Sequence, residues 1–154
     1  MLRWSFLPVA GAVGVLALGA VLAQCAPAPD SGLAFNAEET ADLLPGTWLR
    51  EYGEKGVQVR RLLTLEPRGS FHEVARVTDA NGSVTRFEHE GTWLYDGTNL
   101  KRKYTVVNGQ PPSRLNLPFA TFEIAFASRN EFAGVDHIHG NRIAYRRVAP
   151  DTVP

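Results

Sequence analysis

Hydrophobic and polar residues alternate along most of the chain after residue 45, and the alternation is clearest in residues 83–95, SVTRFEHEGTWLY. From residue 87 onward, every second residue of this segment is aromatic, histidine or glycine, and those between are mostly charged or polar. Successive side chains of a β-strand point to opposite faces of the sheet, so this pattern predicts a strand with one buried face. The residues on that face are Phe87, His89, Gly91, Trp93 and Tyr95.

Segments of the same kind, separated by turn sequences rich in glycine, asparagine, aspartate and proline, fill the rest of this region. They cover residues 46–54, 57–66, 70–78, 83–95, 100–107, 119–127, 131–139 and 141–148. Eight antiparallel strands in sequence order close into an up-and-down barrel, which leaves no exposed edge. A β-sandwich needs longer crossing connections, and only the loop at residues 108–118 is long enough for one. We therefore predict an all-β protein with an eight-stranded antiparallel up-and-down barrel.

The sequence GTWL occurs twice, at residues 46–49 and 91–94. Trp48 lies near the start of the first predicted strand and Trp93 near the end of the fourth, so an up-and-down order brings both to the same end of the barrel. Two copies with unlike flanking residues are too few for a repeat architecture. We interpret the two tryptophans as closing one end of the barrel, with Gly91 allowing the long fourth strand to bend.

These motifs resemble the lipocalin-like small barrels of the calycin group, in which a Gly-x-Trp sequence opens the first strand. Here Gly46 and Trp48 form that sequence. The resemblance implies an arginine near the end of the last strand that packs across the tryptophan ring in a cation–π contact. Because Ile143 and Tyr145 of the segment IAYRRV are expected to point inward, the alternation selects Arg147 rather than Arg146. With one cysteine and no helix expected after the barrel, the chain looks most like the abbreviated bacterial lipocalin-like lipoproteins.

The N-terminal segment has the composition of an export signal. After Arg3, residues 6–23 carry no charge, and the only cysteine of the chain, Cys25, follows closely. A basic start, an apolar core and small residues at its end are typical of a secretory signal peptide, although an uncleaved anchor helix has a similar composition. Leu22-Ala23-Gln24-Cys25 resembles a bacterial lipobox, which implies that Cys25 is lipidated. Ordinary cleavage after Ala23 is the alternative.

This interpretation predicts both the domain organisation and the location. We expect a lipoprotein-type signal peptide at residues 1–24, a flexible tether with one or two helical turns at 25–43, the lipocalin-like barrel at 44–149 and a tail at 150–154. The residue after Cys25 is Ala26 rather than aspartate, which by analogy with lipoproteins favours the periplasmic face of the outer membrane. A soluble periplasmic or secreted protein is the alternative.

The charge balance gives no indication of a nucleic-acid partner. The chain has 16 basic and 16 acidic residues, and removal of Arg3 with the signal peptide leaves 15 basic residues and a net charge near −1. Nucleic-acid-binding domains are usually strongly basic. The densest basic run is Lys101, Arg102 and Lys103, which we interpret as a solvated strand face.

The alternation also places three titratable residues, Arg61, Glu73 and His89, inside the predicted barrel. The apolar residues expected around them are Val57, Val59, Leu63, Leu65, Phe71, Ala75, Phe122, Ile124 and Phe126. A buried charge without a partner is costly, so we expect Arg61 and Glu73 to contact each other or a ligand. The side chains expected around an open cavity are Tyr104, Val106, Phe122 and His89.

Two histidines on the seventh predicted strand have the spacing of metal ligands. His137 and His139 lie on one strand face, which is a start for a zinc site. Pairing across a turn at residues 140–141 sets Ile138 opposite Ile143 and inward, so both histidines face solvent and lack an evident third ligand. We expect neither a metal nor a cofactor.

No motif for catalysis stands out: the sequence lacks Gly-x-Ser-x-Gly, His-Glu-x-x-His and a phosphate-binding glycine loop. We therefore do not expect an enzyme. The resemblance implies a membrane-tethered periplasmic binding protein that holds a small, partly apolar ligand in its barrel. The alternative is a structural or protein-interaction lipoprotein of the cell envelope with a filled barrel. An eight-stranded barrel allows either, because its interior is just wide enough for its own side chains or for one ligand.

Overall fold

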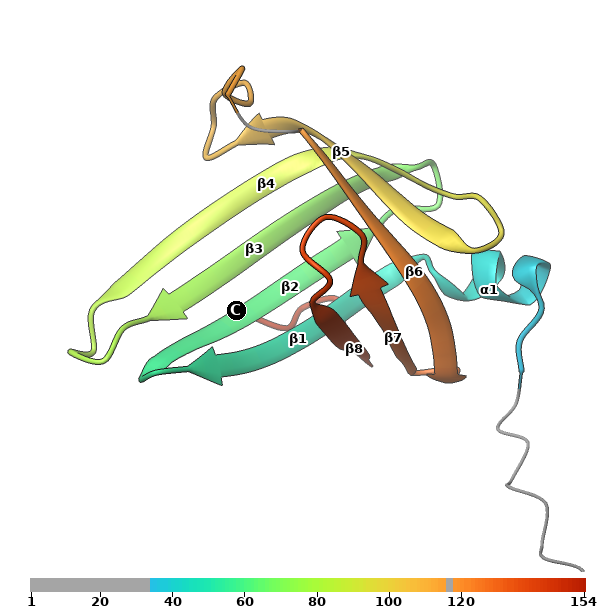
Figure 1. Ribbon diagram of the computed structural model, residues 1–154, viewed down its shortest axis with the longest axis horizontal. Coiled ribbons are helices and arrows are strands. Elements are labelled where there is room, and N and C mark those ends of the chain that lie inside the picture. Colours follow the sequence, from blue (N-terminus) through green and yellow to red (C-terminus); the bar gives the residue numbers. More distant parts are fainter. Residues whose placement is uncertain (1–33, 116–117) are drawn as a thin grey trace, which may run out of the picture. The chain divides into compact units, whose positions relative to one another are not determined.

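The computed structural model describes residues 34–115 and 118–154, which form one short helix and a closed barrel (Figure 1). The elements are α1 (Ala37–Leu43), β1 (Gly46–Glu54), β2 (Val57–Leu65), β3 (Ser70–Thr78), β4 (Val84–Tyr95), β5 (Asn99–Val107), β6 (Phe119–Ser128), β7 (Glu131–Asp136) and β8 (Arg142–Val148). Each strand pairs antiparallel with the next, and β8 pairs with β1. The predicted eight-stranded up-and-down barrel is confirmed, and the predicted strand limits agree to within one residue except in β7.

The predicted signal peptide, the predicted lipid attachment at Cys25 and most of the predicted tether lie outside the described residues. Within residues 34–115 and 118–154, no helix combines the length and the apolar character needed to cross a membrane.

Tight turns join the first strands. Lys55 and Gly56, between β1 and β2, have φ values of 51° and 84°. Positive φ at both central residues characterises the two-residue hairpin turn whose twist matches that of the flanking strands. This turn sets the register in which Trp48 lies opposite Leu63 and Arg50 opposite Arg61. Directly opposed residues share a face of the sheet, so this register decides which side chains enter the barrel.

The predicted register between β7 and β8 is wrong. Strand β7 ends at Asp136, and Ile143 lies opposite Gly134 instead of Ile138. The five residues 137–141 form a longer turn in which the Asp136 carboxylate accepts a hydrogen bond from the Ile138 amide at 2.8 Å. Ile138 consequently lies at the barrel rim with 47% of its surface exposed, because a longer turn moves the pairing away from the one a two-residue hairpin would give.

The backbones of β4 and β5 approach closely at Gly91. A β-carbon at this position would lie 1.9 Å from the Lys103 carbonyl oxygen, so only glycine fits. The pairing also slips by one residue here: Glu90 lies opposite Val106, whereas Gly91 lies opposite Tyr104. The extra residue is a β-bulge, which reverses the alternation in the rest of β5. The expectation that Val106 faces the interior is therefore wrong.

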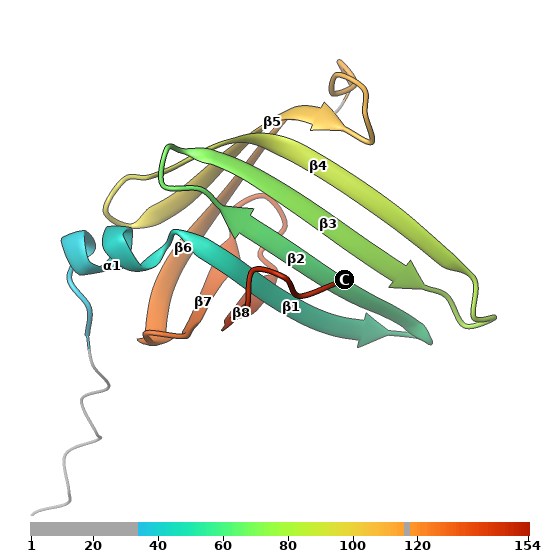
Figure 2. The ribbon, with the colours of Figure 1, turned by 180° about the vertical axis from the view of Figure 1, so that it is seen from behind.

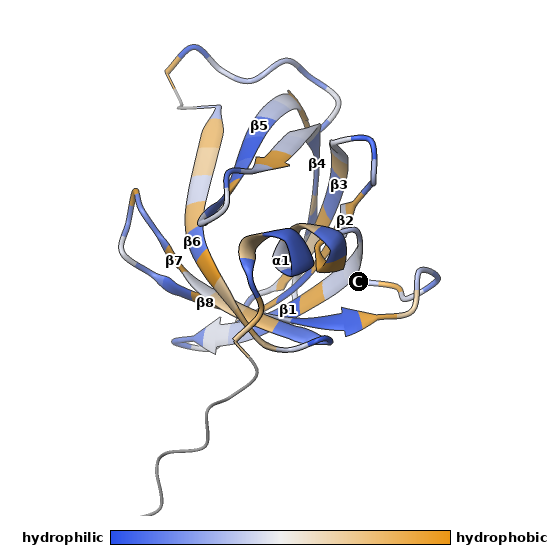
Figure 3. Cartoon of the chain, turned by 90° about the vertical axis from the view of Figure 1, so that its right-hand side faces the viewer, coloured by the Kyte–Doolittle hydropathy of each residue, from blue (hydrophilic) through white to orange (hydrophobic). Residues whose placement is uncertain are grey.

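One end of the barrel is closed by the helix and by Trp48. Asn36 caps α1 and Glu39 completes a reciprocal capping box, and the helix lies across this end of the barrel (Figure 3). Trp48 is fully buried, and its indole Nε1 donates a hydrogen bond to the Leu44 carbonyl at 2.8 Å. Trp93 is partly buried against the same core cluster. Both tryptophans thus pack at this end.

The predicted tether includes residues that are part of the folded domain. The Phe35 ring packs edge-on against Phe126, with ring centroids 6.0 Å apart. Phe35 and Leu43 both pack against the buried core of the barrel. The one or two helical turns expected in this segment are present as α1. From Phe35 onward the segment packs against the barrel, because its apolar side chains contact the core.

The C-terminal segment packs on the outside of the barrel. After β8 the chain crosses the outer face of β1 and β2 (Figure 2), and Arg60 Nε donates to the Val153 carbonyl at 3.3 Å. An outward row on neighbouring strands, formed by Leu49, Leu62 and Val74, is buried. Residues after the barrel thus belong to the packed domain.

Candidate functional site

The centre of the barrel holds a carboxylate surrounded by three positively charged or ionisable side chains. Glu73 of β3 is completely buried. Its Oε2 accepts a hydrogen bond from Arg102 Nη1 at 2.6 Å, and its Oε1 lies 3.0 Å from both Arg61 Nη1 and His89 Nδ1. An ionised carboxylate only accepts hydrogen bonds, so His89 Nδ1 is the donor here. We refer to these four residues as the Glu73 cluster.

Strand register explains how the cluster assembles. His89 of β4 lies directly opposite Glu73, and Arg61 of β2 lies opposite Ala75, two residues along β3 on the same face. Arg102 reaches Glu73 from β5. The predicted inward positions of Arg61, Glu73 and His89 thus converge on one point of the interior.

The interpretation of residues 101–103 as a solvated strand face is wrong for Arg102. Arg102 is 3% exposed, whereas its neighbours Lys101 and Lys103 face solvent. The signal for this placement was present in the sequence, because Arg102 has the same strand parity as Tyr104, which was expected to point inward. The two flanking lysines made a solvent-exposed face the more typical interpretation of this segment.

The electrostatics of the cluster favour the charged forms. Burial would raise the pKa of Glu73, but the charge of Arg102, the hydrogen bond from His89 and the charge of Arg61 together hold this pKa far below its usual value. Burial would likewise lower the pKa of Arg102, but the attraction of Glu73 raises it above the usual value for arginine, and the same holds for Arg61. Glu73 and both guanidinium groups are therefore ionised at neutral pH.

Aromatic rings enclose the Arg102 guanidinium. Its Cζ lies 5.1 Å from the Phe122 ring centroid, 5.4 Å from that of Phe71 and 5.6 Å from that of Tyr104. The Tyr104 ring also packs edge-on against His89 at 5.6 Å, and burial raises the pKa of the Tyr104 hydroxyl. Rings at these distances stabilise a cation through their quadrupoles.

A cavity of about 340 Å³ lies next to the cluster, toward the end of the barrel opposite α1. Its lining residues are Arg50, Tyr52, Arg61, Arg102, Tyr104, Phe119, Ala120, Phe122, Asp136, Ile138, His139, Asn141 and Ile143. Sequence reasoning missed Arg50, although it has the same parity on β1 as Trp48. Its guanidinium carbon lies 4.3 Å from the Tyr52 ring centroid. The cavity combines an aromatic and aliphatic wall with several guanidinium groups.

His89 and Tyr104 also line a second cavity, of about 380 Å³. Its other walls are Val107 and the proline-rich loop between β5 and β6. Because of the bulge, Val107 rather than Val106 occupies the inward position opposite His89. The predicted cavity residues His89, Tyr104 and Phe122 therefore do line interior spaces.

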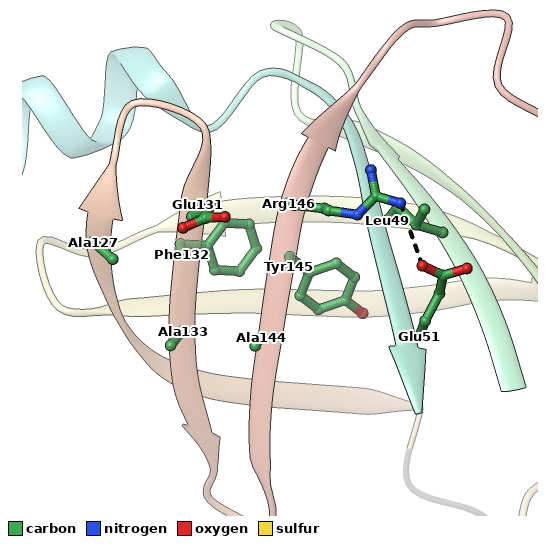
Figure 4. Close-up of a pocket in the computed structure, with 9 residues that line it drawn as sticks. All are labelled: Leu49, Glu51, Ala127, Glu131, Phe132, Ala133, Ala144, Tyr145 and Arg146. Carbon is green, nitrogen blue, oxygen red and sulfur yellow. Dashed lines mark hydrogen bonds and ion pairs between the residues drawn. The ribbon is translucent and has the colours of Figure 1, made fainter. Parts of the chain in front are cut away.

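A depression of about 360 Å³ on the outer face of β6, β7, β8 and β1 is a weaker candidate (Figure 4). Its middle consists of the small side chains Ala133 and Ala144, with the buried ring of Phe132 on the core side of β7. Of its three charged residues, Arg146 and Glu51 already form an ion pair at 3.3 Å, and the third is Glu131. Because the pair satisfies two of these charges, this depression offers fewer polar groups to orient a ligand than the barrel cavity does.

The two histidines near the β7–β8 turn contact different partners. His137 Nε2 lies 3.1 Å from Asn99 Oδ1, and His139 Nδ1 lies 2.9 Å from Asp136 Oδ2. Both rings are substantially exposed. Among residues 34–115 and 118–154, no three histidine, cysteine, aspartate or glutamate side chains are grouped as metal ligands would be.

The end closed by Trp48 has the arrangement that the lipocalin resemblance implies. The Arg147 guanidinium carbon lies 4.2 Å from the Trp48 ring centroid, and Trp48 is directly opposite Arg147 in the β1–β8 pairing. Arg147 also donates hydrogen bonds to the Pro45 and Leu43 carbonyls. Gly46 lies beneath this guanidinium, since a β-carbon there would be 2.3 Å from Arg147 Nη1.

A closed up-and-down barrel, capped by a buried tryptophan and hollow near its other end, defines the fold as a small lipocalin-like barrel. No family model and no curated protein matches the sequence. Among solved structures, a lipocalin-like protein from Bacteroides uniformis matches with a TM-score of 0.42 and 17% sequence identity, over 69% of this chain and 99% of that chain. The function is therefore inferred from this chain's own residues.

Proposed function

We propose that the protein is a binding protein that holds a small, partly apolar ligand in the barrel. The observation that carries this proposal is the cavity of about 340 Å³ beside the Glu73 cluster. Ligand sites of roughly 300–1,000 Å³ are typically lined by aromatic and aliphatic side chains with a few polar groups that orient the ligand. Tyr104, Phe122 and Ile143 supply the apolar wall, and Arg61 and Arg102 supply the polar groups.

A structural or protein-interaction role is the second candidate, and the Glu73 cluster itself favours it. Four large polar side chains meet in the middle of the barrel, where the Glu73 carboxylate accepts hydrogen bonds from the other three. An interior filled in this way can stabilise the fold without having a role in ligand binding. The two roles differ in one respect: only the binding protein needs the cavity to be empty and accessible.

A pair of substitutions on one strand tests accessibility. Ala120 of β6 lines the cavity, whereas Ala125 of the same strand is exposed on the outer face. Ala120→Phe should reduce affinity for the neutral apolar dye N-phenyl-1-naphthylamine about tenfold or more, a loss of about 1.4 kcal/mol, by occupying the ligand's space. Ala125→Phe should leave the affinity within about twofold.

Dye fluorescence titration and native mass spectrometry of the purified domain provide the readouts. Equal dye affinity in the two variants would place the dye elsewhere and contradict a ligand site in the cavity. If the unsubstituted protein neither binds the dye nor carries a co-purified small molecule, the filled-barrel role is the better one.

Export and attachment to the periplasmic face of the outer membrane through a lipid on Cys25 are also part of the proposal. They rest on the uncharged segment at residues 6–23 and the single cysteine behind it. Cys25→Ser should move the protein from the membrane fraction to the soluble periplasmic fraction, as immunoblots of fractionated cells would show. A variant that still sediments with membranes would contradict lipidation and support an uncleaved anchor.

A further inference from the structure

Strand β4 is longer than the strand beside it. Its pairing with β3 starts at Val84, whereas its pairing with β5 starts only at His89. Figure 1 shows the β3–β4 hairpin extending past the end of β5. Within residues 34–115 and 118–154, no strand pairs with residues 84–87 on the β5 side. The barrel therefore has an open sheet edge at residues 84–87, which we call the β4 edge.

The edge is open because a tight turn ends β5. Asn108 and Gly109 have φ values of 50° and 75°, and the Val107 amide donates to the Gln110 carbonyl at 2.7 Å. Positive φ at an Asn-Gly pair is typical of a two-residue turn that reverses the chain. The Asn108 amide donates to the Glu88 carbonyl at 2.7 Å, and its Oδ1 accepts from the Glu88 amide at 2.8 Å. These bonds are the last ones between the two strands.

Two residues of the β4 edge direct their backbone groups away from β3. Residues of an antiparallel strand alternate between the neighbours to which they bond. Because Glu88 bonds on the β5 side, the N–H and C=O groups of Arg86 and Val84 lie on that side too. Both residues are exposed. An open edge of this kind can accept an added strand, whose main chain then forms hydrogen bonds with it.

A row of arginines on the outer face of the sheet leads to this edge. Arg60 of β2 lies directly opposite Arg76 of β3, and Arg76 lies directly opposite Arg86 of β4. Like charges in directly opposed positions destabilise a sheet. At the β1 end of this arginine row, Glu51 lies opposite Arg60 and forms an ion pair with it. A carboxylate thus neutralises one end of the row.

The other end of the arginine row has no equivalent carboxylate. Glu88 Oε2 lies 3.9 Å from Arg86 Nη2, and its second oxygen lies 2.8 Å from His72 Nε2. Arg76 forms no ion pair in the part of the chain that the structure describes. A carboxylate on an added strand, directly opposite Arg86, would neutralise this end as Glu51 neutralises the other.

The inner face of the β4 edge has a different character. Phe87 lies opposite the buried Ala75, so it is on the face that looks into the barrel, yet 36% of its surface is exposed. An apolar side chain on an added strand would cover it. A second copy of the same edge is disfavoured, because antiparallel pairing centred on Arg86 would set two like charges against each other.

We propose that the β4 edge is a docking site for an extended segment of a partner protein in which acidic and apolar residues alternate. The segment adds as an antiparallel strand, with a carboxylate opposite Arg86 and an apolar side chain opposite Phe87. Its main chain bonds to the N–H and C=O groups of Val84 and Arg86. These residues do not line the cavity beside the Glu73 cluster, so the inference does not depend on the proposed ligand.

Three short, terminally blocked peptides test the proposal in NMR titrations of the purified protein. One alternates glutamate with valine, the second has lysine in place of glutamate, and the third is the first peptide N-methylated at its glutamates. The first should bind about tenfold or more tightly than the other two, because only it combines the charge with free main-chain donors. At saturation it should slow amide exchange of Val84 and Arg86 about tenfold or more, but not that of Phe87, which is directed to β3.

Substitutions separate the charge from the backbone. Arg86→Gln should lower the affinity for the glutamate peptide about tenfold, whereas Arg68→Gln, in the exposed turn between β2 and β3, should leave it within about twofold. Val84→Pro removes a donor at the edge, where proline is tolerated, and should also lower the affinity about tenfold. Val84→Thr keeps the donor and should leave the affinity within about twofold.

Each outcome supports or overturns a separate part of the proposal. Equal affinity for the glutamate and lysine peptides would overturn the acidic partner. Binding that survives both N-methylation and Val84→Pro would be attraction between side chains without an added strand. Dimers of the peptide-free protein in sedimentation equilibrium, dissociated by Val84→Pro, would assign the edge to a second copy of the chain. If none of the peptides binds, the inference fails, whereas the dye experiment on the cavity keeps its own result.

Discussion

Glu73→Gln should lower the free energy of unfolding by about 3–5 kcal/mol, because it leaves the buried Arg102 and the partly buried Arg61 guanidinium groups without a counter-charge. Arg102→Met should cost less, since Glu73 would keep Arg61 and His89 as partners. Arg61→Met should cost less again, because part of the Arg61 side chain reaches solvent. Urea unfolding of the three variants measures this order. Glu90→Gln, on the exposed face of β4, is the control and should be nearly neutral.

Acid unfolding provides a second readout of the same substitution. The folded protein holds the pKa of Glu73 below its ordinary value of 4.5, so the stabilisation is complete above pH 4.5. As the pH falls below that value, the unfolded chain binds a proton that the folded chain does not, which costs about 1.4 kcal/mol per pH unit. Glu73→Gln lacks this contribution, so its stability should fall less steeply between pH 4.5 and about pH 3. Parallel slopes would show that Glu73 is not an ionised, paired group.

Trp48→Ala should cost about 3–5 kcal/mol, the usual loss when a large buried aromatic is truncated. The ring packs edge-on against Phe132 at 4.8 Å and Phe126 at 5.8 Å, so its removal opens a cavity in the closed end. Trp93→Ala should cost less, because Trp93 is only partly buried and its Nε1 bonds to the Glu66 carbonyl near the surface. Equal losses at the two positions would contradict the view that Trp48 is the more deeply buried of the two tryptophans at this end.

A double-mutant cycle isolates the contact between Trp48 and Arg147. The coupling energy should be about 0.5–2 kcal/mol, as expected for a partly desolvated cation–π contact. Arg147→Ala should still destabilise the protein after Trp48 is removed, because its guanidinium also holds the Pro45 and Leu43 carbonyls. Arg146, which is exposed on the other face of β8, should show no coupling to Trp48. Coupling to Arg146 instead would mean that the last strand is displaced by one residue.

The alternation of hydrophobic and polar residues was sufficient to predict the architecture, because the barrel imposes the same constraint on every strand. Each strand has one face in the core, so an error at one residue does not change the pattern of the whole segment. The same rule applied to β5 would have placed Arg102 inside, two residues before Tyr104. Three consecutive basic residues are more typical of a solvated strand face, and the partner that stabilises buried Arg102, Glu73, lies 29 residues away in the chain.

Local departures from ideal pairing could not be predicted in this way. Because of the bulge in β5, Val107 faces the interior in place of Val106. No residue type in this segment predicts the bulge. The turn after β7 is five residues long because the Asp136 side chain and backbone bind the turn amides, whereas Gly140 and Asn141 alone favoured a two-residue hairpin. Both features depend on how neighbouring strands twist and meet, which a single sequence does not display.

The position of Glu73 also determines how rigid the barrel interior is before any ligand arrives. Long arginine side chains lose up to about 2 kcal/mol of rotamer entropy each when they are immobilised. Arg61 and Arg102 are held by Glu73 at 3.0 Å and 2.6 Å, so this entropy is lost during folding and not during association. A molecule entering the cavity would meet donors that are already oriented, and it would bind without rearranging the strands around it.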